Sequence, residues 1–275
     1  TLNTAGTISW TAGGVRVGSG GVINNSGLWD CQADNSLSNP FGGTANFNNL
    51  GAGTFRKSSG TGTTTVAIPM SNAGAVEALS GTLSFTATPT GFTQTAGSTT
   101  LNGGALTSST TMSIQGGTFT GTGTATASLT SSGQVAPGLP LGALTLSGNY
   151  TQSSTGALNV AIGGTNAGVN YDQFRVTGTG AASLSGTLGV SLANGFVPVG
   201  GTDFTIMTYV SRTGTFTSLL PPGTNCIGWT TRYDPTAVVV TSVTLPTEVG
   251  GQLVSADKKT LTWAAAPQYA GTVYD

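Results

Sequence analysis

The chain of 275 residues is poor in charge: 8 Lys and Arg stand against 9 Asp and Glu, no His is present, and 6% of residues are charged. A net charge of −1 provides no basic surface for nucleic acid or an anionic membrane. With 37% apolar residues the composition also differs from that of a disordered chain, which combines low hydrophobicity with high net charge. Nucleic-acid-binding and disordered classes are therefore excluded.

No stretch approaches the roughly 20 consecutive apolar residues of a membrane-spanning helix, so we expect none. The chain begins at Thr1 without Met and without a basic-then-apolar leader. We therefore expect it to be a piece of a longer precursor.

Short runs of alternating apolar and polar residues, separated by Gly, Asn and Ser clusters, predict strands of about three to five residues. Leu158, Val160 and Ile162 form one such run. Thr, Gly, Val and Asn dominate every window and are poor helix formers. Only residues 72–80 could form a turn of helix.

A polar turn motif of Asn, Ser and Gly recurs three times near the N-terminus. It places Asn25, Asn49 and Asn72 at steps of 24 and 23 residues, each followed closely by an apolar strand. A coil of a parallel β-helix needs about this many residues, and coils stack at roughly 4.8 Å. The spacing predicts an all-β, right-handed parallel β-helix of roughly ten coils, on the order of 50 Å long. From Gly81 onward the units are expected to be shorter and less regular.

The pattern of residues changes near the end of the chain. A Val-rich strand, 238–245, precedes Pro246, and Leu261 and Trp263 alternate beyond it. This pattern is typical of the opening strands of a β-sandwich that ends before its sheet closes. We therefore predict a β-solenoid over residues 1–245 and a short incomplete β-sandwich-like segment over 246–275.

The runs 117–164 and 171–219 (GTFTGTGTATASLTSSG… and YDQFRVTGTGAASLSGTL…) resemble the β-solenoid repeats of large secreted bacterial surface proteins, including autotransporter-type adhesins. The resemblance covers about residues 1–243, and the segment PTEVGGQLVSADKKTLTWAAA resembles the start of a fibronectin type III-like domain. It implies export, an extracellular or cell-surface location and a much longer parent chain. It supplies no catalytic signature.

The absence of His removes Ser-His-Asp and Cys-His triads and His-ligated metals. No G-x-S-x-G elbow and no phosphate-binding loop are present. We therefore expect no enzyme activity and no cofactor. Asp30 and Asp34 are candidates for a Ca²⁺ site, although the simpler interpretation is that they cap turns.

Asp172 and Asp203 each precede a short strand and are expected to be turn residues at similar positions in successive repeats, with Arg175 and Arg212 as nearby ion-pair partners. Five threonines alternate from Thr118 to Thr126, which predicts five hydroxyls on one strand face. An ice-binding array would need the same positions in every rung, and the spacing predicts that neighbouring units do not keep this register. A solvated Thr ladder is the simpler interpretation.

Aromatic side chains offer an alternative function. Such rings stack on sugars, although filling the interior or capping an end of the solenoid is the simpler role. The candidates for carbohydrate stacking are Trp10, Trp29, Trp229 and Tyr233.

The cysteines and the C-terminal segment bear on assembly. Cys31 and Cys226 would stand many coils apart in a rod, so we expect no disulfide between them. Strands that cannot close a sandwich leave backbone groups unpaired, so Val254, Leu261 and Trp263 are candidates for an assembly tail that contacts the next subunit.

Together these features predict an extracellular structural or adhesive surface segment, a stalk able to assemble head to tail into filaments. Its expected partners are further copies of itself or other cell-surface proteins and glycans. The alternative is a carbohydrate-binding or carbohydrate-active β-helix.

Overall fold

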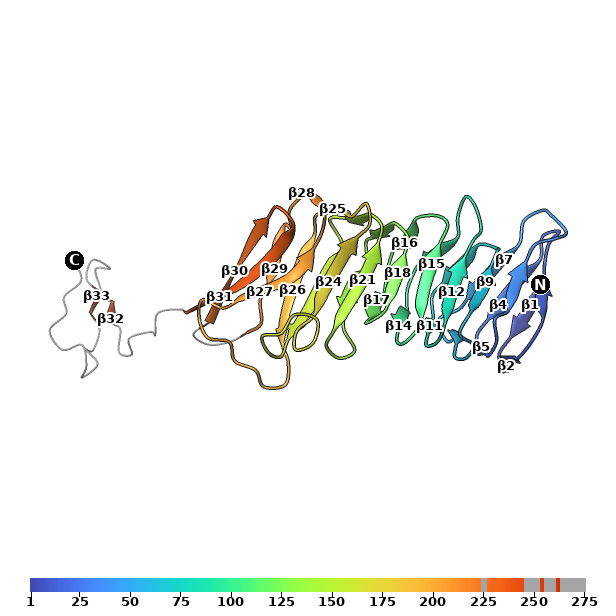
Figure 1. The fold of residues 1–275 in the computed structure, drawn as a ribbon, viewed down its shortest axis with the longest axis horizontal. Coiled ribbons are helices and arrows are strands. Elements are labelled where there is room, and N and C mark those ends of the chain that lie inside the picture. Colours follow the sequence, from blue (N-terminus) through green and yellow to red (C-terminus); the bar gives the residue numbers. More distant parts are fainter. Residues whose placement is uncertain (224–226, 245–252, 255–260, 263–275) are drawn as a thin grey trace.

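A computed structural model describes residues 1–223, 227–244, 253–254 and 261–262. Every regular element in these residues is a β-strand, and the strands stack into an elongated rod with the N-terminus at one end (Figure 1). Most coils contribute three strands, one to each of three long sheets that run along the rod. We call these sheets A, B and C.

The three sheets have the following strands in spatial order. Sheet A consists of β1 (Leu2–Thr4), β4 (Val22–Asn25), β7 (Asn46–Asn49), β10 (Met70–Asn72), β13 (Phe92–Gln94), β16 (Met112–Ile114), β19 (Leu129–Ser131), β22 (Tyr150–Gln152), β25 (Ala181–Leu184) and β28 (Ser211–Gly214). Sheet B consists of β2 (Thr7–Trp10), β5 (Leu28–Cys31), β8 (Thr54–Lys57), β11 (Ala75–Ala78), β14 (Ser98–Leu101), β17 (Thr118–Gly121), β20 (Gln134–Pro137), β23 (Ala157–Ile162), β26 (Thr187–Leu192) and β29 (Ser218–Leu220). Sheet C consists of β3 (Gly14–Arg16), β6 (Ser36–Ser38), β9 (Thr63–Val66), β12 (Thr82–Phe85), β15 (Ala105–Ser108), β18 (Thr124–Thr126), β21 (Ala143–Ser147), β24 (Gln173–Thr177), β27 (Asp203–Thr208), β31 (Ala237–Thr244) and β30 (Ile227–Asp234).

Each strand of sheets A and B pairs in parallel with the equivalent strand of the next coil, which confirms the predicted parallel β-helix. Sheet C departs from this pattern at its C-terminal end. There β31 pairs antiparallel with β27, and β30 pairs antiparallel with β31. The chain therefore ends its last coil with a hairpin, which the sequence did not predict.

The predicted tail lies largely outside the described residues. Within it the structure describes only the short antiparallel pair β32 (Leu253–Val254) and β33 (Leu261–Thr262). Trp263 and the remainder of the segment 246–275 lie outside the described residues. The boundary at residue 245 and the fibronectin type III-like interpretation remain predictions.

Coil length varies through the connections rather than the strands. Paired positions are 16 residues apart between Thr118 and Gln134 but 31 apart between Thr187 and Ser218. The units after Gly81 are thus shorter at first, as predicted, and longer towards the end. The added length lies in the two connections from sheet B to sheet C at residues 163–172 and 193–202.

Alternating strand residues fill the interior. The inward position of nearly every strand is a fully buried aliphatic or aromatic residue, so stacking coils produces one continuous apolar column. Near the N-terminus the aromatic rings of Trp10, Trp29, Phe47 and Phe55 contact one another edge to face, with centroids 5.1 to 5.9 Å apart. Such edge-to-face contacts add to the free energy gained from burial.

A ladder of buried amides marks the corner between sheets A and B. The Nδ2 of Asn25 donates a hydrogen bond to the Oδ1 of Asn49, and the Nδ2 of Asn49 donates to the Oδ1 of Asn72, each at 2.8 Å. Thr4 and Gln94 extend the ladder at its two ends. The predicted polar repeat is therefore an inward-facing network that satisfies backbone groups of the turns.

Two local predictions were wrong. Residues 72–80 form no helical turn, since they comprise the last residue of β10, the strand β11 and the bends that flank β11. The five alternating threonines do not share one face, because Thr118 and Thr120 lie on β17 in sheet B whereas Thr124 and Thr126 lie on β18 in sheet C. Period-two alternation continued across the turn between two sheets, and the pattern alone cannot show that the chain changes direction there.

The outward faces of the three sheets differ. Sheet A carries one column in which Ser71, Thr93, Ser113, Thr130 and Thr151 follow one another in register. Sheet C carries two outward columns that consist of Ser and Thr except at Ala105. Sheet B is mixed and includes charged residues. The prediction that neighbouring units lose register was therefore wrong for sheets A and C.

Replacing Asn49 by Ala should lower the free energy of unfolding by about 3 kcal/mol, because it leaves the amide of Asn25 and the carbonyl of Ala75 without this partner inside the rod. Urea unfolding followed by circular dichroism measures the loss. The matched control is Asn48→Ala on the same strand, whose amide points outward and donates to Asn24. Equal losses for the two variants would contradict the role given to the buried ladder.

Candidate functional site

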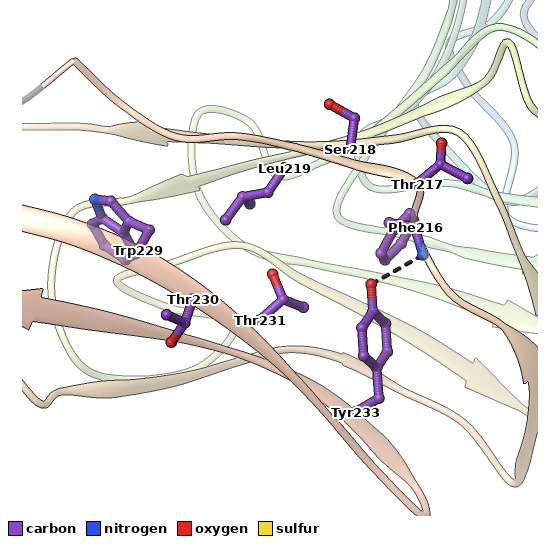
Figure 2. A pocket seen from close by; sticks show the side chains of 8 residues that line it. All are labelled: Phe216, Thr217, Ser218, Leu219, Trp229, Thr230, Thr231 and Tyr233. Atoms are coloured by element: carbon purple, nitrogen blue, oxygen red, sulfur yellow. Dashed lines mark hydrogen bonds between the residues drawn. The ribbon is translucent and has the colours of Figure 1, made fainter.

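A cleft of about 350 Å³ opens at the C-terminal end of the rod (Figure 2). It lies between the last strand of sheet B, β29, and the hairpin strand β30 of sheet C. Sheet C continues for two strands after β27, and these strands form one wall of the cleft. The lining residues are Phe216, Thr217, Ser218, Leu219, Trp229, Thr230, Thr231 and Tyr233.

The aromatic side chains of the cleft are held by specific contacts. The backbone N–H of Phe216 donates to the hydroxyl of Tyr233 at 3.0 Å, as Figure 2 shows. The guanidinium of Arg212 lies over the Tyr233 ring at 4.9 Å, and the Phe216 ring lies 6.4 Å from it. Burial raises the pKa of Tyr233, so its hydroxyl stays protonated at neutral pH.

The cleft also contains polar atoms that lack partners. Trp229 packs against Phe204 with ring centroids 6.0 Å apart and is only 9% exposed. Its Nε1 and the Oγ1 of Thr231 are buried and have no hydrogen-bond partner among the described residues. Because both atoms are buried, neither is exposed to a ligand in the cleft, and their lack of partners does not define a ligand site.

The structure brings together only two of the four aromatic residues considered for sugar stacking. Trp229 and Tyr233 line the cleft, whereas Trp10 and Trp29 lie buried in the first two coils at the opposite end of the rod. Stacking on a sugar needs a free ring face. Arg212 covers one face of Tyr233 and Trp229 is largely buried, so these ring faces are not available for stacking on a sugar.

Asp30 and Asp34, considered for Ca²⁺, have separate partners. The carboxylate of Asp34 accepts hydrogen bonds from the Nζ of Lys57 at 2.9 Å and from the backbone N–H of Gly62. One oxygen of Asp30 accepts a hydrogen bond from Gln32, and the other is buried with no partner among the described residues. Among the described residues no group of three or more acidic or thiol side chains could hold a metal ion.

Lys57 is a residue that the sequence analysis missed. Its side chain is fully buried at the corner between sheets B and C, and its ammonium also donates to the carbonyls of Ala33 and Ser59 and to the hydroxyl of Thr64. An ammonium has three protons to donate, so these acceptors saturate it. Lys57 thus joins two turns of adjacent coils.

The neighbouring thiol is also part of the core. Cys31 stands beside Lys57 in the register of sheet B and is free and buried. Burial raises its pKa to about 12. Cys226 lies outside the described residues, so the expectation of no disulfide between the two cysteines stays a prediction.

Asp172 and Asp203 are not equivalent positions. Asp172 is buried, and its two carboxylate oxygens accept hydrogen bonds from the backbone N–H groups of Gly142 and Ala161. Asp203 is exposed and pairs with Arg232 at 3.0 Å. The predicted pairing of these acids with Arg175 and Arg212 was therefore wrong, because the last coil adds a hairpin whose Arg232 reaches Asp203 instead.

The position of the Asp172 carboxylate depends on the backbone conformation of a neighbouring turn. Gly138 has a φ of +96°, and a Cβ at this position would overlap the Oδ1 of Asp172. The carboxylate thereby fits directly against the turn that ends β20. Desolvation raises the pKa of Asp172 to about 6, although its two backbone hydrogen bonds act in the opposite direction.

Of the three residues considered as an assembly tail, Val254 and Leu261 pair with each other between β32 and β33, and Trp263 lies outside the described residues. The structure therefore leaves the role of this segment as a prediction.

No protein-family model matches the chain. No curated protein matches it either. Within the described ranges, no helix has the length and apolar character needed to cross a membrane.

The free energy of unfolding should fall as the pH rises from about 4 to about 6, by on the order of 1 kcal/mol once solvent screening is allowed for. In this range the folded protein retains a proton on Asp172 that the unfolded chain has lost, since its pKa is raised from 3.8 to about 6. The chain has no His to titrate in the same window. Urea unfolding at several pH values measures the slope.

The control for this slope is Asp172→Asn, which removes the titration and should flatten the profile between pH 4.5 and 6.5. The prediction fails if the variant keeps the full decline, or if the stability of the native protein rises across this range.

Proposed function

We propose that this chain is a stalk segment of an extracellular surface protein. The observation that supports the proposal is the rod itself, in which sheets A and B each continue through ten parallel strands. Each coil adds about 4.8 Å of length. The number of coils therefore sets the distance over which the segment separates whatever lies at its two ends.

The physical properties of the rod suit this role. Backbone hydrogen bonds between coils and one continuous apolar core join every coil to its neighbours, so bending would have to break both. The surface carries little charge and many hydroxyls, which keep it hydrated over a range of salt concentrations. A spacer needs stiffness and hydration more than it needs a reactive site.

The resemblance to repeats of secreted bacterial surface proteins and adhesins supports the extracellular location. Under this proposal the partners of the segment are neighbouring cell-surface proteins or glycans, or further copies that stack head to tail into filaments.

Antibodies raised against the purified chain test the proposal on intact cells that produce the parent protein. We expect immunogold particles at a fixed distance outside the cell envelope without permeabilisation. Negative-stain electron microscopy of the purified chain over a concentration series then shows separate rods or filaments. Labelling only after the cells are permeabilised would contradict an extracellular stalk.

A further inference from the structure

The outward face of sheet C carries a two-column array of hydroxyls over five consecutive coils. The strands β9, β12, β15, β18 and β21 lie in succession along the rod (Figure 1). Their burial alternates, so every second side chain points outward. We call the ten outward positions the hydroxyl face: Thr63, Thr65, Thr82, Ser84, Ala105, Thr107, Thr124, Thr126, Thr145 and Ser147.

The register of this face is continuous. In one column Thr65 pairs with Ser84, Ser84 with Thr107, Thr107 with Thr126 and Thr126 with Ser147. The other column is interrupted only at Ala105. Nine of the ten positions are therefore hydroxyls, although the connections between the strands differ in length.

The other two faces of the same coils provide an internal comparison. Sheet A has three-residue strands there, so it presents a single outward column. The outward positions of sheet B include Arg56 and Glu77, which form an ion pair at 2.7 Å, and Ala136. The two-column array is thus particular to sheet C and does not follow from the solenoid fold alone.

The hydroxyls of this face have no partners among the residues that the structure describes. None of the nine makes a hydrogen bond to another described residue, so each is free to donate and accept outward. Seven of the nine belong to Thr, whose methyl group lies beside its hydroxyl. The face therefore combines fixed hydrogen-bonding groups with small apolar groups that order the adjacent water.

The spacing of the columns matches that of hydrogen-bonded water. Two water molecules bonded to a common third molecule lie roughly 4.5 Å apart when O···O distances are about 2.75 Å and the geometry is tetrahedral. Successive strands of a sheet lie about 4.8 Å apart. Across the five coils the two spacings diverge by only about 1 Å, which is well under one O···O distance.

We propose that the hydroxyl face binds the surface of ice. Water anchored to the nine hydroxyls at this spacing matches a row of the ice lattice, and none of the ten positions carries a charge that would hold its own hydration shell in a different arrangement. A crystalline polysaccharide is a poorer fit, because no position of the face bears an aromatic ring for stacking on sugars. This binding is independent of the stalk function proposed above.

Ice affinity can be measured with the whole chain in two ways. Nanolitre osmometry should show thermal hysteresis that increases with protein concentration, and a growing ice hemisphere should incorporate fluorescently labelled protein. Replacing Thr107 by Tyr in the middle of the face should abolish both effects, because the ring holds the ice away from the neighbouring hydroxyls.

The matched control is Thr130→Tyr, which places the same ring on the outward column of sheet A. It should keep the thermal hysteresis of the unmodified chain, and circular dichroism verifies that both variants fold. The proposal is overturned if the unmodified chain shows neither effect, if Thr130→Tyr is as damaging as Thr107→Tyr, or if the chain binds cellulose or chitin powder through this face but not ice.

Discussion

Register between coils is the constraint on which the rest of the structure depends, and the buried amide ladder fixes it where the chain turns from sheet A to sheet B. An Asn side chain that points inward must find partners, because a buried amide without them destabilises the fold by a few kcal/mol. The amide of Asn25 donates to the side-chain oxygen of Asn49, and the amide of Asn49 donates to that of Asn72. The Asn49 amide also donates to the backbone carbonyl of Ala75. If the register of a strand shifted by one residue, these amides would point outward, and so would the apolar side chains on the same face of the strand.

At other corners of the rod, different side chains hold adjacent coils in register. At the corner between sheets B and C, the buried ammonium of Lys57 joins a carboxylate, two carbonyls and a hydroxyl from adjacent coils. Further along, Asp172 accepts two backbone N–H groups where the connections become longer. With the corners fixed, the strands between them differ little, and their outward side chains form regular columns.

The sequence predicted the all-β class, the parallel coils and the polar repeat, because Asn at steps of 24 and 23 residues is a direct signal of stacked turns. It did not predict that Gln94 continues the ladder, since a different residue type fills the same role there. The terminal hairpin was also missed, because parallel and antiparallel strands show the same alternation of apolar and polar residues. The partners of Lys57 and Asp172 come from distant coils and could not be read from local patterns. The columns of sheet C were missed because connections of unequal length hide their register.

A distance measurement tests most directly whether the coils stack in this register. Spin labels at Ser71→Cys and Ser183→Cys, in a chain with Cys226→Ser, stand five strands apart on the outer column of sheet A. Double electron–electron resonance should give a narrow distribution that corresponds to about 24 Å between the two backbone positions. Moving the first label to Asn48→Cys should lengthen the distance by about 4.8 Å. A broad distribution, or no change when the label is moved, would contradict a rigid solenoid with this register.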